Sequence, residues 1–267
     1  MSTLETTLRI FPRLHAPRSW RLVERNIASS RGAWLVFVSG FFEPLFYLFA
    51  MGVGVGALVG TVDVNGESVG YREFVGPALL AASAMNGAVY DATFNFFFKF
   101  KYRKLYDAVL ATPLGPLDVA IGEITWALIR GALYAAGFLA VMAGMGLLTS
   151  FWALLALPAA LLIAFGFAAV AMACTTFMRS WQDFDYVQLA LMPMFLFSTT
   201  FFPITVYPGA LAFAVKCFPL YHAIELMRGL CTGFVDASMI GHLAYFAVMA
   251  VVGVVVSAKR LGKLLLS

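Results

Sequence analysis

Long apolar runs constrain this chain more than any other feature of its sequence. A membrane-spanning helix needs roughly 20 apolar residues, and six runs approach or exceed that length. They cover residues 33–58, 75–98, 119–147, 152–177, 187–205 and 238–257. The chain is 62% hydrophobic and 12% charged, which is more apolar surface than a soluble fold of 267 residues can bury. The sequence therefore predicts an all-α polytopic membrane protein with six transmembrane helices.

Basic residues indicate the orientation of these spans. Arginines crowd residues 1–31, four basic residues lie at 99–104, and three more lie at 259–263. With six spans, all of these segments fall on one side of the membrane. Lysine and arginine favour the cytoplasmic side, so both termini are expected there. We expect residues 1–31 to form a cytoplasmic amphipathic segment at the membrane interface, and 32–267 to form a single six-helix transmembrane domain.

The connection between the second and third spans contains a short amphipathic pattern. Its apolar residues recur with helical spacing and end before Pro113. They are Tyr102, Leu105, Tyr106, Val109 and Leu110. The pattern has two interpretations: a helix lying among lipid headgroups, or a helix that docks a cytoplasmic partner.

Four charged residues lie inside the expected spans, where an unpaired charge costs several kcal/mol. They are Glu43, Asp91, Glu123 and Arg130. At 1.5 Å of rise per residue, Glu43 lies about 16 Å and Arg130 about 18 Å from the cytoplasmic ends of their spans, with Asp91 next in depth. We expect Arg130 to pair with Glu43 or Asp91. Such a pair would fix helix register, or it would line a substrate path.

Residues 203–237 are divided by prolines into pieces too short to span a membrane. Glu225 and Arg228, three residues apart, are expected to form a local ion pair. Cys217 and Cys231 both fall on the extracytoplasmic side, where a disulfide can persist, and the sequence leaves open whether they are bridged. His222 has no second histidine nearby in the sequence, so no metal site is expected.

Glycines recur every four residues at the end of the first span, at Gly52, Gly56 and Gly60. Small residues with this spacing let membrane helices approach closely. We expect them to serve helix packing, either within the chain or against a second membrane subunit.

Two motifs resemble the type-2 export permeases of the ATP-binding-cassette (ABC) superfamily. One is EPLFYLFAMGVGVGALVG at 43–60, and the other is FPLYHAIELMRGL at 218–230. The resemblance is strongest to permeases that export nodulation lipo-oligosaccharides, with daunorubicin-type drug exporters as relatives, and it covers nearly the whole chain.

The resemblance implies a division of labour between subunits. Two permease chains, identical or homologous, would form the path, and separate ATPase subunits would bind beneath them. The 101–112 segment would be the coupling helix pushed by the ATPase. Re-entrant helices carrying Pro219, Glu225 and Arg228 would form the extracytoplasmic gate. The chain has no Gly-x-x-x-x-Gly-Lys-Ser/Thr phosphate loop, so ATP and magnesium would bind to the partner and no cofactor to this chain.

The leading hypothesis is a permease subunit of an ATP-driven exporter in the bacterial inner membrane. It would move an amphipathic substrate, such as a lipo-oligosaccharide, glycolipid or hydrophobic drug, and would not itself be an enzyme. Membrane lipid is an expected partner and nucleic acid is not. One alternative is an ion-coupled transporter with Glu43 and Asp91 as proton carriers. Another is an intramembrane lipid-modifying enzyme, which the sparse polar residues argue against.

Overall fold

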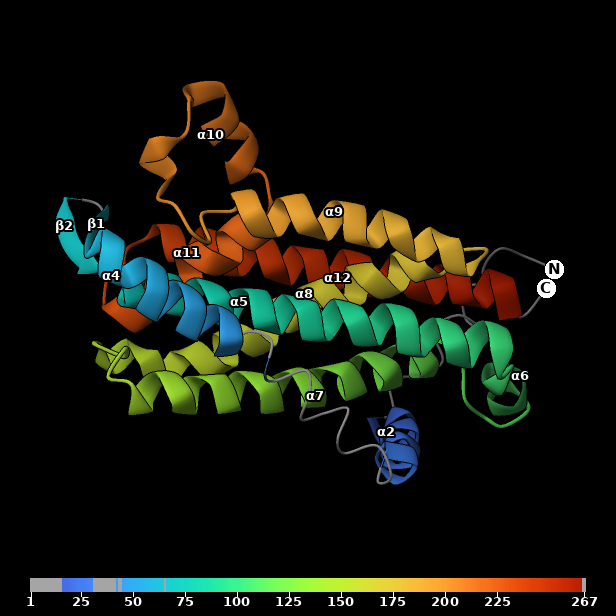
Figure 1. Cartoon of the computed structure of the whole chain (residues 1–267). Helices are drawn as coiled ribbons and strands as arrows, with labels where there is room; N and C mark the ends of the chain where they lie inside the picture. The colour runs from blue at the N-terminus through green and yellow to red at the C-terminus, as the bar shows by residue number, and fades with distance from the viewer. Residues whose placement is uncertain (1–15, 31–41, 43–44, 65, 266–267) are drawn as a thin grey trace.

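The structure is a computed structural model that describes residues 16–30, 42, 45–64 and 66–265. Long helices run side by side along one axis and dominate this part of the chain (Figure 1). They are α5 (Tyr71–Tyr90), α7 (Pro116–Gly144), α8 (Ala156–Thr175), α9 (Phe184–Phe197) and α12 (Ser238–Leu265). The mainly helical, apolar architecture agrees with the expected membrane protein.

Shorter elements gather at the two ends of this bundle (Figure 1). One end carries the strands β1 and β2 together with α10 and α11. The opposite end carries α6 and the last turns of α12. The bounds are β1 (Thr61–Val64), β2 (Glu67–Gly70), η4 (Phe151–Leu155), η6 (Ile204–Val206), α10 (Gly209–Lys216), α11 (Pro219–Thr232), α6 (Leu105–Leu110) and η5 (Trp181–Asp183). Helix α2 (Ala16–Ser30) packs against α7 beside the bundle.

Three helices among the described residues are long and apolar enough to cross a membrane. They are Pro116–Gly144, Phe151–Thr175 and Ser238–Leu264. Helices α10 and α11 meet at a bend of 84° and make a fourth candidate only if taken as one broken span. The expected first span begins outside the described residues, and its visible part is the shorter apolar helix Leu45–Val59. Six spans therefore remain a prediction.

The second expected span is part of a longer helix. It begins at Tyr71 and stays helical to Tyr102, through π-helical stretches η2 (Asp91–Asn95) and η3 (Phe98–Tyr102). The fifth expected span, 187–205, is helical only as far as Phe197. A kinked, non-helical stretch follows, in which Thr199 has φ of +62°.

A β-hairpin departs from the expected all-α fold. Strands β1 and β2 pair antiparallel, with Thr61 opposite Gly70 and Val64 opposite Glu67. Gly66 has φ of +86°, and its backbone N–H donates to the Asp63 side chain over 2.8 Å. The hairpin bridges the first apolar helix and α5.

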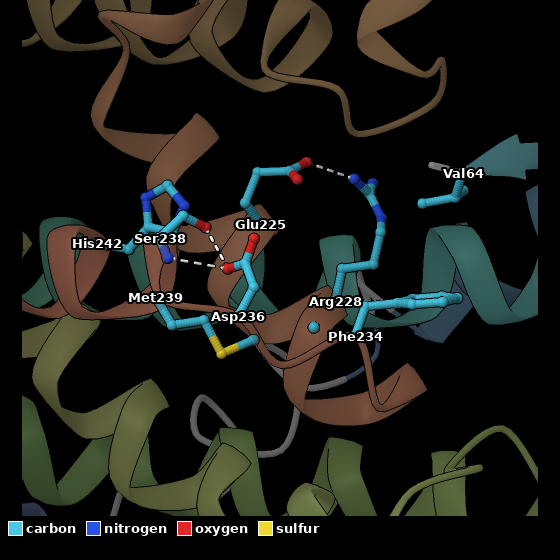
Figure 2. Close-up of a pocket in the computed structure, with 9 residues that line it drawn as sticks. Val64, Glu225, Arg228, Phe234, Asp236, Ser238, Met239 and His242 are labelled. Carbon is cyan, nitrogen blue, oxygen red and sulfur yellow. Dashed lines mark hydrogen bonds and ion pairs between the residues drawn. The ribbon is translucent and has the colours of Figure 1, made fainter. Parts of the chain in front are cut away.

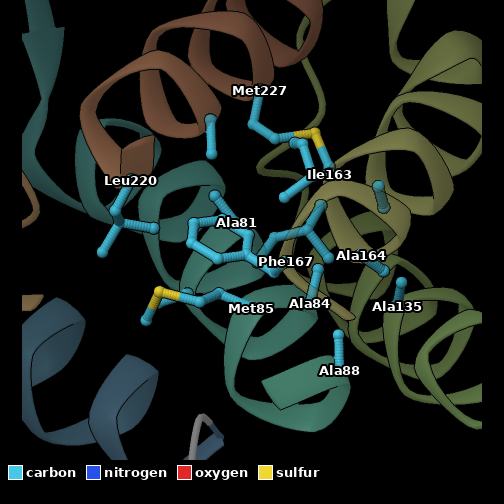
Figure 3. Close-up of a cluster of buried hydrophobic side chains, with 14 of the residues drawn as sticks. Ala81, Ala84, Met85, Ala88, Ala135, Ile163, Ala164, Phe167, Leu220 and Met227 are labelled. Atoms are coloured by element: carbon cyan, nitrogen blue, oxygen red, sulfur yellow. The ribbon is translucent and has the colours of Figure 1, made fainter. Parts of the chain in front are cut away.

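Alanine-rich surfaces form the core where α5, α7, α8 and α11 meet. Figure 3 shows small side chains such as Ala84 and Ala164 lying beside the larger Met85, Phe167 and Met227. Small side chains let membrane helices approach closely enough for dispersion forces to hold them together. Helix α12 also approaches α8 closely, because a Cβ added to Gly253 would lie 2.6 Å from the backbone carbon of Ala169.

Two of the three glycines of the first apolar helix, Gly52 and Gly56, lie against α5 of the same chain. Within π-helix η1 (Ala50–Val55), Gly52 accepts a hydrogen bond on its carbonyl from Arg72 Nε over 2.9 Å. Gly52 and Gly56 both lie against the Arg72 side chain, at ordinary contact distance. Gly60 has φ of +70° and no neighbour within 4 Å of an added Cβ, so it ends helix α4 (Gly56–Val59) and does not support packing within the chain.

Candidate functional site

A buried ion pair joins α7 to π-helix η2 in the middle of the bundle. Arg130 Nη1 lies 2.5 Å from Asp91 Oδ1, and both side chains are almost fully buried. Arg130 also donates to the Tyr134 hydroxyl over 3.4 Å, and Asn95 donates to Asp91 from the next turn of the helix. The expectation that Arg130 pairs with Glu43 or Asp91 is thus met by Asp91. Glu43 lies outside the described residues.

The backbone around Asp91 helps to explain the geometry of this pair. Asp91 is the first residue of a π-helical turn, and such turns occur frequently at functional sites. Two opposite charges with an amide and a phenol around them can be buried together at far lower cost than either charge alone.

A second polar cluster lies nearer the α6 end, and we call Glu123, Arg25, Asn26 and Lys99 the Glu123 cluster. Glu123 is 5% exposed. Its carboxylate accepts hydrogen bonds from Lys99 Nζ at 2.6 Å, from Asn26 Nδ2 at 3.1 Å and from Arg25 Nη2 at 3.2 Å. Lys99 also donates to Asn26 Oδ1 over 3.1 Å. The cluster joins α2, η3 and α7.

Close packing of α2 on α7 makes the Glu123 cluster possible. A Cβ added to Gly122 would lie 2.9 Å from the backbone oxygen of Ser19 and from the Leu22 side chain. Leu22 and Val23 are buried. The described part of the amphipathic segment therefore packs on the protein through Leu22 and Val23, while Trp20 and Ile27 stay exposed. Its place at the membrane interface stays a prediction.

Helix α6 turns its apolar face inward. Tyr106 is fully buried and stacks on Phe96, with ring centroids 5.4 Å apart. Leu105 and Val109 are half-buried against the same core. Of the five residues expected to face a partner, Tyr102 is exposed, and the Leu110 side chain lies outside the described part of the chain.

Arg228 organises the opposite end of the bundle. It donates to Glu225 Oε1 over 2.7 Å, which confirms the expected local ion pair, and to the Thr199 carbonyl over 2.8 Å. Its guanidinium lies 3.9 Å from the centre of the Phe74 ring on α5. Arg228 is 5% exposed, so it ties α11 to α5 and to the kink after α9. Pro219 begins α11 at its first turn.

A polar hollow lies next to this arginine (Figure 2). Its wall combines the Glu225–Arg228 pair with Asp236, Ser238 and His242. Asp236 accepts hydrogen bonds from the hydroxyl and backbone N–H of Ser238, which lower the pKa of its carboxyl. Apolar side chains complete the lining: Val64, Phe234 and Met239.

Two histidines meet beside this hollow. His222 Nδ1 on α11 lies 2.8 Å from His242 Nδ1 on α12, and the His222 ring stacks on Tyr245. The expectation that His222 has no histidine neighbour is therefore wrong, because the two residues are 20 positions apart and meet only through the packing of α11 on α12. No group of three or more His, Cys, Asp or Glu among the described residues could hold a metal ion.

The bridge between Cys217 and Cys231 does not form. All three cysteines lie in the described part of the chain and are free, with Cys217 exposed and Cys231 buried. Helix α11 separates the two residues, which places them about 20 Å apart along its axis. A disulfide needs Cα atoms within about 7 Å, so the helix itself excludes the bond.

The long apolar helices are those of a membrane protein, and its described part carries ion pairs at three places along the bundle and a bent helix pair at one end. The chain belongs to the ABC-2 type transporter family, whose model matches residues 18–232. It is thus a membrane component of a transporter.

Relatives named nodulation protein J resemble it along most of its length. Nodulation protein J of Rhizobium meliloti (strain 1021) is 32% identical over 192 residues, which cover 72% of each chain. Nodulation protein J of Rhizobium leguminosarum bv. trifolii is 30% identical over 249 residues, 92% of each chain. The protein of the same name from Sinorhizobium fredii is 30% identical over 254 residues.

Proposed function

We propose that this chain is the permease subunit of an ATP-driven exporter in a bacterial inner membrane. Its substrate is an amphipathic molecule of the lipo-oligosaccharide or glycolipid class. The observation that carries the proposal is the family match over residues 18–232, supported by nodulation-protein relatives that align with nearly the whole chain. The bundle has both termini in the cytoplasm and six spans in this proposal.

Energy for export comes from a separate ATPase subunit. The chain contains no phosphate loop, so ATP and magnesium bind to that subunit. A second permease chain completes the path. Helix α9 supports this assembly because Phe184 is its only buried residue, while its remaining surface is largely apolar. Such a surface suits lipid or a second membrane chain.

The ATPase docks on the outward side of α6 and the residues that flank it. Arg103, Lys104 and Ala108 are exposed there, whereas Tyr106 holds α6 on the bundle from within. Docking therefore uses the polar side of the amphipathic helix, and the apolar side keeps the helix attached to the permease. On the opposite end, Glu225 and Arg228 form the extracytoplasmic gate.

The test is to purify the tagged chain gently from its native membrane and to identify an ATPase that carries a phosphate loop. Ala108→Asp places a negative charge on the exposed side of α6 without disturbing the buried Tyr106. Gln182→Glu adds the same charge at an exposed position of η5, at the same end of the bundle.

We expect an ATPase to co-purify with the native chain and with Gln182→Glu, and to be lost from Ala108→Asp. If the Ala108→Asp variant retained the ATPase, α6 would not be the docking element. Absence of any ATPase from the native preparation, under conditions that preserve other membrane complexes, would overturn the proposed function and favour ion coupling.

A further inference from the structure

Glu123 is the one carboxylate in the described residues that joins three separate segments by ion pairs or hydrogen bonds. It sits on the second turn of α7 and accepts hydrogen bonds from two residues of α2 and one of η3. Along the sequence, Glu123 is 98 residues from Arg25, 97 from Asn26 and 24 from Lys99. A surface carboxylate would need none of these partners, so the convergence points to a role in positioning the segments.

The charge balance of the Glu123 cluster depends on this carboxylate. Arg25 and Lys99 approach the same side chain from different helices, and both also contact the Asn26 amide oxygen. Without the negative charge, two cations would face each other in a largely buried space, where their repulsion is weakly screened. Neutralising Glu123 should therefore drive α2 and η3 apart while the apolar packing of each remains.

Helix α6 follows η3 directly in the chain and is therefore connected to the same carboxylate through Lys99. Tyr106 is fully buried. Its burial, followed by the nearby negative charge of Glu123, raises the pKa of the Tyr106 hydroxyl well above its ordinary value. Lys99 lies in η3, which leads directly into α6 through a turn where Lys104 has φ of +45°. A displacement of α6 thus reaches Glu123 through Lys99, whose Nζ lies 2.6 Å from the carboxylate.

Helix α2, on the other side of the Glu123 carboxylate, packs closely enough on α7 to move together with it. Gly122 precedes Glu123 and lets the α2 backbone approach α7 so closely that no side chain fits between them. Helix α2 is therefore fixed to α7 by direct packing, and to η3 through the Glu123 carboxylate.

We propose that Glu123 is a positioning residue that joins α2 to the α6 connection, so that displacement of α6 by the ATPase moves α2 as well. The inference rests on the proposed function, because it needs an ATPase on α6. It gives α2 a mechanical role in the transport cycle, beyond anchoring the chain at the membrane surface.

The experiment compares Glu123→Gln with Glu24→Gln in the purified permease–ATPase complex. Glu24 is a matched control because its carboxylate is exposed and pairs only with Arg21 on the same helix among the described contacts. Spin labels at exposed Ala28 and at exposed Ala111, directly after α6, report the distance between α2 and the α6 connection by pulsed electron paramagnetic resonance, in a background without native cysteines. Only labelled chains that retain the ATPase are measured. ATP hydrolysis and export of a fluorescent glycolipid into inverted vesicles are measured on the same preparations.

In the native complex and in Glu24→Gln, we expect one narrow distance distribution that shifts as a unit when ATP with vanadate is added. In Glu123→Gln, we expect a broad distribution, retained ATP hydrolysis, and glycolipid exported per ATP reduced about 2- to 30-fold, the span of typical coupling energies. Lys99→Arg should keep the native export ratio and Lys99→Met should lower it, which tests the link without changing Glu123.

An unchanged distance response and an unchanged export ratio in Glu123→Gln would overturn the inference and leave the proposed function standing. Equal behaviour of Lys99→Arg and Lys99→Met would overturn it as well. Failure of the native chain to retain an ATPase would instead overturn the proposed function, and with it the basis of the inference.

Discussion

Arg130 on α7 donates a 2.5 Å hydrogen bond to Asp91 at the start of a π-helical turn, and both side chains are buried. Removing one member of a buried pair leaves an uncompensated charge, which costs about 3–5 kcal/mol, whereas removing both is much less harmful. We expect Arg130→Met and Asp91→Asn each to lower the thermal stability of the detergent-purified chain strongly. The double variant should recover most of the loss.

Asp185→Asn is the control for this comparison, because Asp185 is exposed at the start of α9. A double variant as unstable as the sum of the two single variants would show that Arg130 and Asp91 do not depend on one another.

Gly253 should not tolerate even a methyl group. Its Cβ would lie 2.6 Å from the Ala169 backbone, which cannot rotate away as a flexible side chain could. Overpacking of this kind costs about 1–3 kcal/mol, so we expect Gly253→Ala to lower the unfolding temperature. Gly241→Ala on the same helix, with nothing within 4 Å of its Cβ, should be neutral or slightly stabilising. Equal unfolding temperatures would contradict the close approach of α12 to α8.

Arg228→Lys should weaken the end of the bundle that holds the polar hollow. A lysine cannot donate to Glu225 and to the Thr199 carbonyl while also stacking on Phe74, as the planar guanidinium does. Leaving a buried carbonyl without its donor costs about 1–3 kcal/mol. Faster hydrogen exchange in α11 would report the loss. The control Arg179→Lys, at an exposed position, should leave exchange unchanged, and slow exchange in both variants would refute the role of Arg228.

Asp183 should make the connection before α9 sensitive to acid. The backbone N–H groups of Arg179 and Ser180 donate to its carboxylate and lower its pKa below the ordinary value of 3.8. The pKa of the Asp183 carboxyl is lower in the folded than in the unfolded chain. The stabilisation it provides is therefore fully present above pH 3.8 and is lost as the pH falls through the pKa of the folded state. In the Asp183→Asn variant, the amide hydrogens of this connection should therefore exchange faster than in the native chain near neutral pH. The difference between the two exchange rates should shrink in acid. A difference in exchange rate that does not change with pH would show that the Asp183 carboxylate is not its cause.

The depth of Arg130 and Asp91 could be predicted from the sequence because helical rise is fixed, and depth matching narrowed the partners of Arg130 to two residues. The partners of Glu123 could not be found in this way. Arg25 and Asn26 lie on a helix outside the expected spans, and only the close approach permitted by Gly122 brings them to Glu123. The available signal for these partners in the sequence was Gly122, which directly precedes the buried acid Glu123.

The amphipathic pattern predicted a helix at α6 but could not show what covers its apolar face. Tyr106 meets Phe96 of the same chain, a contact that depends on the tertiary turn at Lys104. The meeting of His222 with His242 has the same origin, because the sequence shows neither the bend between α10 and α11 nor the packing of α11 on α12.

Helices α8 and α12 touch backbone to backbone at Gly253 and Ala169. Helices normally shift against each other by small changes in the side chains between them, and at Gly253 no side chain separates the two backbones. Helices α8 and α12 are therefore expected to move together as one rigid unit, and other helices can rotate against that unit. Opening and closing of the transporter should therefore involve the helices around this pair, and α9, in which only Phe184 is buried, is a candidate for such movement.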